Sequence, residues 1–121
     1  GPCVIKRLRG CGAGCEYVAI TPEGDIYPCH QFVGNEDYKL GSLYDGTFDK
    51  ELSGRFAGLN IYTREECRDC WARFYCSGGC SASNLLVNGD IKKPHRVGCE
   101  LERKRLECAI ALRAIAAGMA E

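Results

Sequence analysis

The sequence lacks an excess of charge of either sign, and it lacks any long apolar run. Sixteen basic residues balance sixteen acidic ones in 121 residues, so nothing in the charge predicts binding to nucleic acid or to an anionic membrane. No apolar run approaches the roughly 20 residues that a membrane-spanning helix needs, and the N-terminus has no signal-peptide core. We therefore expect a cytoplasmic protein without nucleic-acid or membrane partners.

The sequence is also poor in bulky apolar side chains. Its apolar fraction includes ten cysteines and eleven alanines, which leaves little material for a large hydrophobic core. Many cysteines together with 15 glycines are typical of a fold that is cross-linked or organised by metal. Four of the thiols lie in "CRDCWARFYCSGGC" (67–80), with the spacing C-x2-C-x5-C-x3-C.

The N-terminal third predicts a β-hairpin in "YVAITPEGDIY" (17–27). Two β-prone runs flank Pro22 and Gly24, which suit the positions of a tight turn. Cys15 and Cys29 stand at the open end of this hairpin, where cross-strand neighbours approach within about 5 Å. The glycine-rich "CGAGC" (11–15) can bring Cys11 beside them, so we expect three thiols to converge there. Residues 30–62 show no sustained period and are predicted to be ordered loop with short helical turns.

The cysteine-rich segment predicts short helices. Thr63 and Glu66 have the spacing of a capping box, and the helix that would follow presents Cys67 and Cys70 on one face. Cys76 and Cys80 repeat this arrangement at i, i+4.

Two further elements are expected after that segment. Asn88-Gly89 predicts a second hairpin over residues 85–91. A terminal helix is expected after Cys99, with Glu100–Lys104 and Arg103–Glu107 ion pairs on its exposed side. Its apolar stripe would make Cys108 a buried core thiol, and the full stripe is Leu101, Cys108, Leu112, Ile115 and Met119.

Three kinds of structure could use so many thiols. A disulfide scaffold fits the even number of cysteines, but such scaffolds are usual in shorter, secreted chains. Zinc prefers two C-x2-C pairs, and this segment contains one, Cys67/Cys70. A 4Fe–4S cluster takes one thiolate at each iron and suits wider, uneven gaps. The spacing therefore favours iron–sulfur clusters, with zinc as the alternative.

The order of these residues resembles the seven-cysteine signature of SPASM domains, the auxiliary-cluster modules of radical S-adenosylmethionine (SAM) peptide maturases. The match runs from Cys11 through Gly24 and Cys29 to the C-x2-C-x5-C-x3-C segment and Cys99. "TPEGDIYPCHQFVG", "KLGSL" and "SGGC" are most similar to the maturases that install thioether bonds in SCIFF-type peptides.

The resemblance implies two 4Fe–4S clusters with interleaved ligands, in a small irregular α+β fold of β-hairpins, short ligand-bearing helices and a C-terminal helix. The signature requires only one cysteine upstream of Gly24, so we predict that Cys15 is weakly held or absent, which leaves a position for a cysteine of the substrate. The implied ligands are Cys11, Cys15, Cys29 and Cys80 for the first cluster and Cys67, Cys70, Cys76 and Cys99 for the second.

The motif for SAM cleavage, C-x3-C-x2-C, is missing from this sequence. The sequence has two C-x3-C pairs, Cys11/Cys15 and Cys76/Cys80. The position where the third cysteine of the motif would stand is Val18 after the first pair and Ser83 after the second. Gly1-Pro2 resembles a protease-cleavage remnant. We therefore expect residues 1–10 to be a remnant and a linker from a radical SAM barrel upstream, and residues 11–121 to form the SPASM domain. By itself the chain would not be catalytic.

The implied function is that of an auxiliary domain of a maturase that forms thioether crosslinks in a cysteine-rich ribosomal peptide. The clusters would transfer electrons or bind a substrate thiolate, and the partners would be the upstream barrel and the precursor peptide. A zinc-stabilised interaction module without redox chemistry is the alternative.

Overall fold

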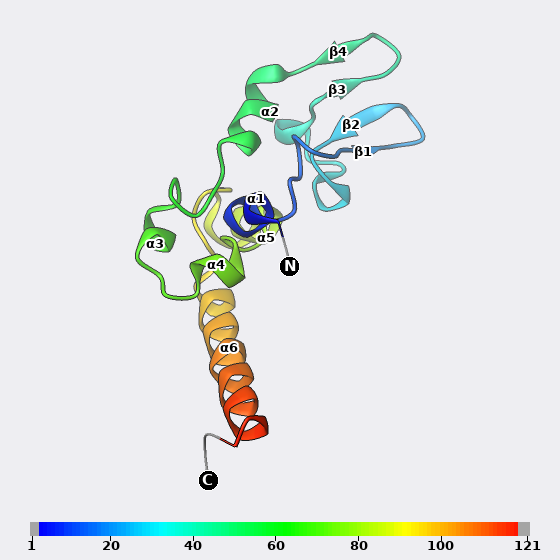
Figure 1. The fold of residues 1–121 in the computed structure, drawn as a ribbon. Helices are drawn as coiled ribbons and strands as arrows, with labels where there is room; N and C mark the ends of the chain where they lie inside the picture. Colours follow the sequence, from blue (N-terminus) through cyan, green and yellow to red (C-terminus); the bar gives the residue numbers. More distant parts are fainter. Residues whose placement is uncertain (1–2, 119–121) are drawn as a thin grey trace.

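A four-stranded antiparallel sheet lies at one end of the molecule, and the long C-terminal helix projects from the opposite end (Figure 1). The structure is a computed structural model and describes residues 3–118. The strands follow one another in chain order as β1 (Ala19–Ile20), β2 (Asp25–Tyr27), β3 (Gly41–Ser42) and β4 (Thr47–Phe48). Together with the short helices, this sheet confirms the small α+β fold that the sequence predicts.

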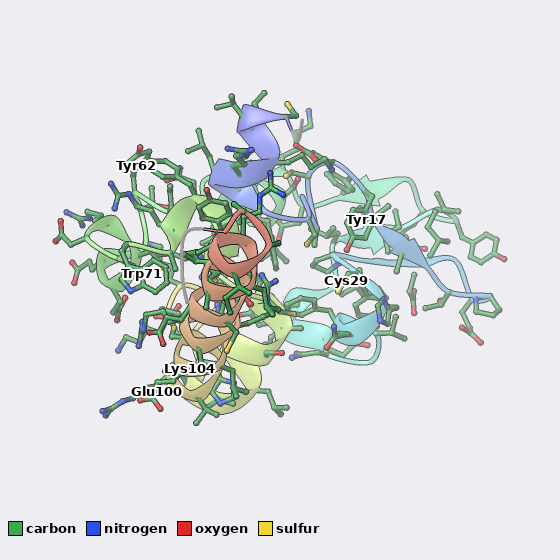
Figure 2. All side chains as sticks on the ribbon, turned by 60° about the horizontal axis from the view of Figure 1, so that its bottom comes forward. Tyr17, Cys29, Tyr62, Trp71, Glu100 and Lys104 are labelled. Carbon is green, nitrogen blue, oxygen red and sulfur yellow. The ribbon has the colours of Figure 1, made fainter. Side chains whose placement is uncertain are left out.

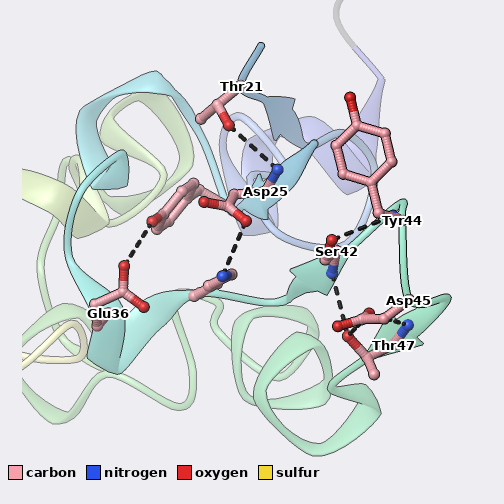
Figure 3. A network of polar contacts seen from close by, with 9 residues as sticks. Thr21, Asp25, Glu36, Ser42, Tyr44, Asp45 and Thr47 are labelled. Atoms are coloured by element: carbon pink, nitrogen blue, oxygen red, sulfur yellow. Dashed lines mark hydrogen bonds and ion pairs between the residues drawn. The ribbon is translucent and has the colours of Figure 1, made fainter. Parts of the chain in front are cut away.

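The predicted N-terminal hairpin is formed by β1 and β2. Ala19 pairs with Tyr27, and Ile20 pairs with Ile26. The turn is closed at Thr21, whose N–H donates to the Asp25 carbonyl over 2.9 Å and whose side-chain oxygen accepts from the Asp25 N–H over 3.2 Å (Figure 3). The hairpin prediction is therefore confirmed.

A second hairpin joins β3 to β4, in the region that the sequence predicted to be loop. Ser42 N–H donates to the Thr47 hydroxyl over 3.2 Å, and Thr47 N–H donates to the Asp45 carboxylate over 2.9 Å (Figure 3). The expected helical turns are present as η1 (His30–Phe32) and η2 (Glu36–Tyr38). The loop prediction is wrong for β3 and β4, because side-chain hydrogen bonds in the turn hold strands that are too short to show alternation.

Helix α2 (Lys50–Ala57) was also not predicted. Asp49 begins it by accepting a hydrogen bond from Leu52 N–H over 2.9 Å, as an N-cap residue does. Leu52 and Phe56 bury the inner face of α2 against the sheet side of the molecule. Around them lies one core, whose buried members are Ala13, Ile26, Tyr27, Cys29, Phe32, Leu40, Leu52, Phe56, Leu59 and Ile91.

The expected N-terminal linker contains helix α1 (Val4–Arg9), which packs on the body of the domain. Ile61 N–H donates to the Leu8 carbonyl over 3.0 Å, and the Arg9 guanidinium donates to the Ala57 carbonyl over 2.8 Å. Residues 4–9 are thus tied to the end of α2 and to the segment that follows it.

The cysteine-rich segment contains helices α3 (Glu65–Arg68) and α4 (Arg73–Cys76). The capping-box prediction is wrong, since the N-cap of α3 is Arg64 and Thr63 instead donates to the Gly58 carbonyl over 2.8 Å. The prediction that each cysteine pair shares one helix face is also wrong. Helix α3 ends at Arg68, before Cys70, and Cys76 and Cys80 lie on different elements. Helix α4 ends at Cys76, and residues 77–79 all have positive φ, at 63°, 93° and 76°. This left-handed run turns the chain between the two cysteines.

Helix α5 (Ser81–Asn88) replaces the second hairpin that the sequence predicted. Asn-Gly is a hairpin signal, but glycine in the left-handed region is also the commonest end of a helix, and Gly89 has φ 70° at the C-cap of α5. Asn84 on this helix is buried. Its amide donates to the Ile91 carbonyl over 3.4 Å and its oxygen accepts from His95 N–H over 3.0 Å.

The terminal helix α6 (Arg96–Ala116) begins before Cys99, which therefore lies in its first turn. The stripe prediction is wrong for the side chains of α6 that the structure describes. Leu106 is the buried residue, whereas Leu101 is 67% exposed and Cys108 is exposed; Met119 lies outside the described residues.

The ion pairs of α6 also differ from the predicted pairs. Glu100 pairs with Arg96 over 3.4 Å, and Lys104 pairs with Glu107 (labels of Glu100 and Lys104 in Figure 2). Within residues 3–118, none of the helices has the length and apolarity that a bilayer crossing requires.

Candidate metal centre

Five thiols line one cavity of about 320 Å³ between α3, α4, α5 and the start of α6. This is roughly ten times the volume that one water molecule occupies in the liquid. The cavity collects thiols that are up to 32 positions apart in the sequence, because α3, α4, α5 and the start of α6 all contribute to its lining. Its five cysteines are Cys67, Cys70, Cys76, Cys80 and Cys99.

The pKa values in this cavity show that its thiols lie within electrostatic reach of one another. Burial raises the pKa of the Cys67 thiol to about 11, Arg64 opposes the change, and Cys99, Cys76 and Cys70 add to it. Burial likewise raises the pKa of Cys99, and the charge of Cys76 raises it further. Four negative thiolates would therefore repel one another here unless cations held them together.

Arginines supply positive charge beside the cavity. Arg73 and Arg103 line it, and the Arg73 Nη1 donates to the Cys70 carbonyl over 2.9 Å. The Nε atom of Arg73 is buried and has no hydrogen-bond partner among the described residues. A buried N–H without a partner is costly, and an anionic group in the cavity would offer it an acceptor. The donor set of thiols with this unpaired N–H fits a thiolate-ligated iron–sulfur cluster.

Arg64 lies behind the same cavity and is only 3% exposed. Its Nη1 donates to the Ile91 carbonyl over 2.5 Å, and its Nη2 donates to the Ser81 hydroxyl over 3.2 Å. Burial lowers the pKa of its guanidinium, and the charge of Cys67 opposes that change. Arg64 thus connects the Cys67 helix, α5 and the segment after α5.

A second group of thiols lies around the Tyr17 hydroxyl. This hydroxyl is 3.9 Å from Cys11 Sγ and donates to it. Burial, this hydrogen bond and the charges of Cys11, Cys29 and Cys80 together raise the pKa of Tyr17 to about 12. Tyr17 and Cys29 lie on the side of the molecule away from Trp71 (Figure 2).

Cys15 is oriented differently from these three thiols. Its Sγ donates to the Gly12 carbonyl of its own loop over 3.4 Å, and the side chain is exposed. Cys15 shares with Cys11 and Gly79 the lining of a small hollow of about 20 Å³. The structure thus places Cys11 in contact with the Tyr17 hydroxyl and leaves Cys29 and Cys80 within electrostatic range of it. The Cys15 thiol is directed at its own backbone.

Cys80 lies between the cavity thiols and the thiols near Tyr17. It lines the large cavity and also acts on Tyr17. Burial raises the pKa of its thiol, but donors of Ser83, Ala82 and Gln31 outweigh this effect and leave the pKa lowered. Gln31 Nε2 lies 3.8 Å from the sulfur. A thiol at the N-terminus of a helix with such donors is favoured as the thiolate, the form that binds metal.

The described thiols are not spaced for a single ion. Within residues 3–118, no group of three or more His, Cys, Asp or Glu side chains lies close enough together to hold one metal ion. The large cavity lies between the thiols instead. The thiols therefore line a cavity, as the ligands of a polynuclear metal cluster would.

Sequence reasoning missed two of the donors in these surroundings, namely Tyr17 and Gln31. Tyr17 and Gln31 lie outside the cysteine motif, and Gln31 meets a thiol 49 positions away. No local pattern in a sequence reports such contacts. Cys108, expected to be buried, is exposed and lines none of the hollows described above.

Comparisons with known proteins identify a family that binds an iron–sulfur cluster. Residues 11–71 match the profile of the SPASM family, described as an iron–sulfur cluster-binding domain. An uncharacterized protein of Archaeoglobus fulgidus is 31% identical over 80% of this chain and 24% of its own length. A PqqA peptide cyclase of Xanthomonas axonopodis pv. citri is 31% identical over 65% of this chain and 22% of its own length.

A third relative is a serine-type anaerobic sulfatase-maturating enzyme of Klebsiella aerogenes. It is 28% identical over 68% of this chain and 20% of its own length. The chain thus spans about a quarter or less of the curated relatives that it matches.

The fold and its thiol-lined cavity define a cysteine-rich domain whose donor set suits metal. The match over half of its length identifies the family: the chain belongs to the SPASM iron–sulfur cluster-binding domains.

Proposed function

We propose that this chain is the auxiliary domain of a radical SAM peptide maturase and binds two 4Fe–4S clusters. The observation that carries the proposal is the grouping of the thiols, in which one set surrounds a single cavity and another gathers at Tyr17. The first cluster would be held by Cys11, Cys29 and Cys80, with Cys15 as a weak or absent fourth ligand, and the second by Cys67, Cys70, Cys76 and Cys99.

The clusters would supply one-electron chemistry and, at the first site, a coordination position for a substrate thiolate. The chain's own residues would orient and shield them. Arg73 and Arg103 would offset the negative charge of the second ligand set. The direction of the Cys15 thiol toward the Gly12 carbonyl supports an open position at the first site.

The proposed context is a larger enzyme, because the relatives extend well beyond the matched region. Residues 1–10 would lead from a radical SAM barrel, and residues 11–121 would form the auxiliary domain. The substrate would be a cysteine-rich precursor peptide that receives thioether crosslinks. The names of two relatives, a peptide cyclase and a sulfatase-maturating enzyme, support a peptide or protein as the substrate.

Metal analysis of the anaerobically reconstituted chain tests the cluster proposal. We expect about eight irons and eight acid-labile sulfides per chain. Cys70→Ala should lose about four irons through the second site, and Cys29→Ala about four through the first. Cys108→Ala, which removes an exposed thiol outside both sets, is the matched control and should keep all of them. A colourless protein with about two zinc ions would show a zinc-stabilised module instead.

Cys15→Ala tests the open position. We expect this variant to keep its iron, and we expect a cysteine-containing peptide to alter the electron paramagnetic resonance (EPR) signal that Cys29→Ala lacks. Loss of about four irons in Cys15→Ala would make Cys15 a full ligand. A peptide that altered only the signal lost in Cys70→Ala would place substrate at the other cluster.

A further inference from the structure

Two side chains outside the cysteine set direct hydrogen-bond donors at thiols of the first group. The Tyr17 hydroxyl donates to Cys11 Sγ over 3.9 Å, and Gln31 Nε2 donates to Cys80 Sγ over 3.8 Å. Both distances are within the range of hydrogen bonds to sulfur. The two donors come from different elements, one from the loop before β1 and one from η1.

The backbone fixes the position of Tyr17. Gly14 N–H is shared between the carbonyls of Tyr17 and Pro28, at 3.0 Å from each, and Ala13 forms a bridge with Tyr17. These bonds tie the loop that carries Cys11 to the strand end that precedes Cys29. The Tyr17 ring is therefore held at the junction of two of the three thiol-bearing segments.

The core fixes the position of Gln31. It is the central residue of η1, and its neighbour Phe32 is 2% exposed and contacts the Phe56 ring edge-on at 5.4 Å between centroids. Phe32 N–H donates to the Cys29 carbonyl over 3.0 Å. The Gln31 amide is thus presented to Cys80 by a buried anchor.

Donors to ligand sulfurs act on the electronics of a cluster. A reduced cluster carries one more negative charge than the oxidised one, and a hydrogen bond to a thiolate stabilises negative charge on sulfur. Such donors therefore favour the reduced state and make the reduction potential less negative. An amide does not titrate and an ordinary phenol stays protonated near neutral pH, so both groups are able to donate.

We propose that Tyr17 and Gln31 are positioning residues that act through Cys11 and Cys80 to raise the reduction potential of the first cluster. The proposal rests on the ligand set proposed above. Neither residue is a ligand in this assignment, so removing their donors should change the potential of the first cluster and leave its iron content unchanged.

The test is an EPR-monitored redox titration of the reconstituted chain and its variants. Tyr17→Phe and Gln31→Leu should each make the midpoint of the first cluster more negative, and the double variant should move it further. The second cluster should keep its midpoint in all of them. Tyr27→Phe is the matched control, because its hydroxyl donates to the Glu36 carboxylate over 3.2 Å, and it should behave as wild type. The signal that disappears in Cys29→Ala identifies the first cluster.

Two results would overturn the inference. One is a first-cluster midpoint that is the same in wild type, Tyr17→Phe and Gln31→Leu; the other is an equal shift of both clusters, which would indicate a general structural effect. Wild-type protein that lacked the Cys29-dependent signal or held only four irons would instead reject the two-cluster proposal, and the inference with it.

A measurement on wild type covers the case in which a variant fails to take up its cluster. Protein made with ring-deuterated tyrosine should show deuteron couplings to the first cluster in electron–nuclear double resonance, because Tyr17 is in contact with Cys11. No such coupling would remove Tyr17 from the proposal.

Discussion

Gly14→Ala, in the loop that carries Cys11 and Cys15, should lower the free energy of unfolding more than Gly46→Ala does. Gly14 has φ 82°, and a Cβ built on it would lie 2.8 Å from Cγ of Phe56. Gly46 has a similar φ of 69° but nothing within 4 Å of its Cβ position. The pair therefore separates the cost of the backbone conformation, which both variants share, from the cost of the contact, which only one has.

The magnitudes follow from these two terms. The left-handed conformation costs an alanine about 1–2 kcal/mol, of which about 0.4–1 kcal/mol is recovered because alanine restricts the unfolded chain. Gly46→Ala should thus lose about 1 kcal/mol. Overpacking against a buried ring adds about 1–3 kcal/mol, so Gly14→Ala should lose about 2–4 kcal/mol. Phe56 has little room to yield, because Phe32 and Tyr38 both contact its ring edge-on.

Thermal unfolding of the reconstituted chain, recorded at one scan rate by circular dichroism, measures the difference. One kcal/mol corresponds to about 3–6 °C for a chain of this size, so Gly14→Ala should unfold at least about 3 °C below Gly46→Ala. We also expect it to lose iron from the first site, since the loop holding Cys11 must move away from Phe56. Equal unfolding midpoints for the two variants would refute the cost of the contact with Phe56. Full iron content in Gly14→Ala would show that the loop can hold Cys11 in place without the close approach of Gly14 to Phe56.

Four other predictions test separate parts of the structure. Cys108→Ala should alter the free energy of unfolding by less than about 0.5 kcal/mol, as is usual for exposed sites; a loss above about 1 kcal/mol in a thermal melt would show that Cys108 is covered. In the metal-free chain, Cys80 should react with iodoacetamide before Cys67 as pH rises from 7 to 9, because the pKa of Cys80 is lowered and burial holds that of Cys67 near 11; peptide mapping that found Cys67 first would contradict this order. The raised pKa of Cys67 also stabilises the folded metal-free chain below the unfolded thiol pKa of about 8.5, and this stability should be lost as pH rises toward 11; a flat urea midpoint over that range would exclude it. Asp49→Ala should cost about 1 kcal/mol by removing the acceptor of Leu52 N–H, and an unchanged urea midpoint would show that α2 needs no cap.

The features that the sequence predicts well are those with a short-range physical cause. The hairpin over 17–27 depends on turn residues and on flanking β-prone residues, and both are local. The terminal helix is long enough for its period to be recognised. The family was likewise predictable, because cysteine spacing reflects which thiols can share a site.

The features that were missed depend on competition between signals or on distant contacts. Asn88-Gly89 serves equally as a hairpin turn and as a helix end, and packing of Asn84 in the interior favours the helix. Strands β3 and β4 have two residues each, too few to show alternation. The apolar stripe of α6 was predicted from its period alone, and a period does not say which side of a helix is covered; Leu106 is buried instead of Leu101.

The candidate site was predictable as a set of cysteines and not as a geometry. Nothing in the sequence indicates that Cys80 would line the cavity of the other group, or that Tyr17 would reach Cys11. The placement of Cys80 depends on how the chain turns at residues 77–79, which brings it to the start of a new helix.

That turn constrains how the sequence can vary during evolution. Ser77, Gly78 and Gly79 are consecutive left-handed residues, and a Cβ at Gly78 would lie 2.8 Å from Nε of Arg64. At Gly79 the nearest atom would be 3.8 Å away, so the barrier to substitution there comes from the backbone alone. Relatives could therefore change the side chains packed near Gly79 and still retain the glycine itself. A glycine retained at position 79 would thus reflect the left-handed backbone conformation that this turn requires, and not a chemical role of the residue.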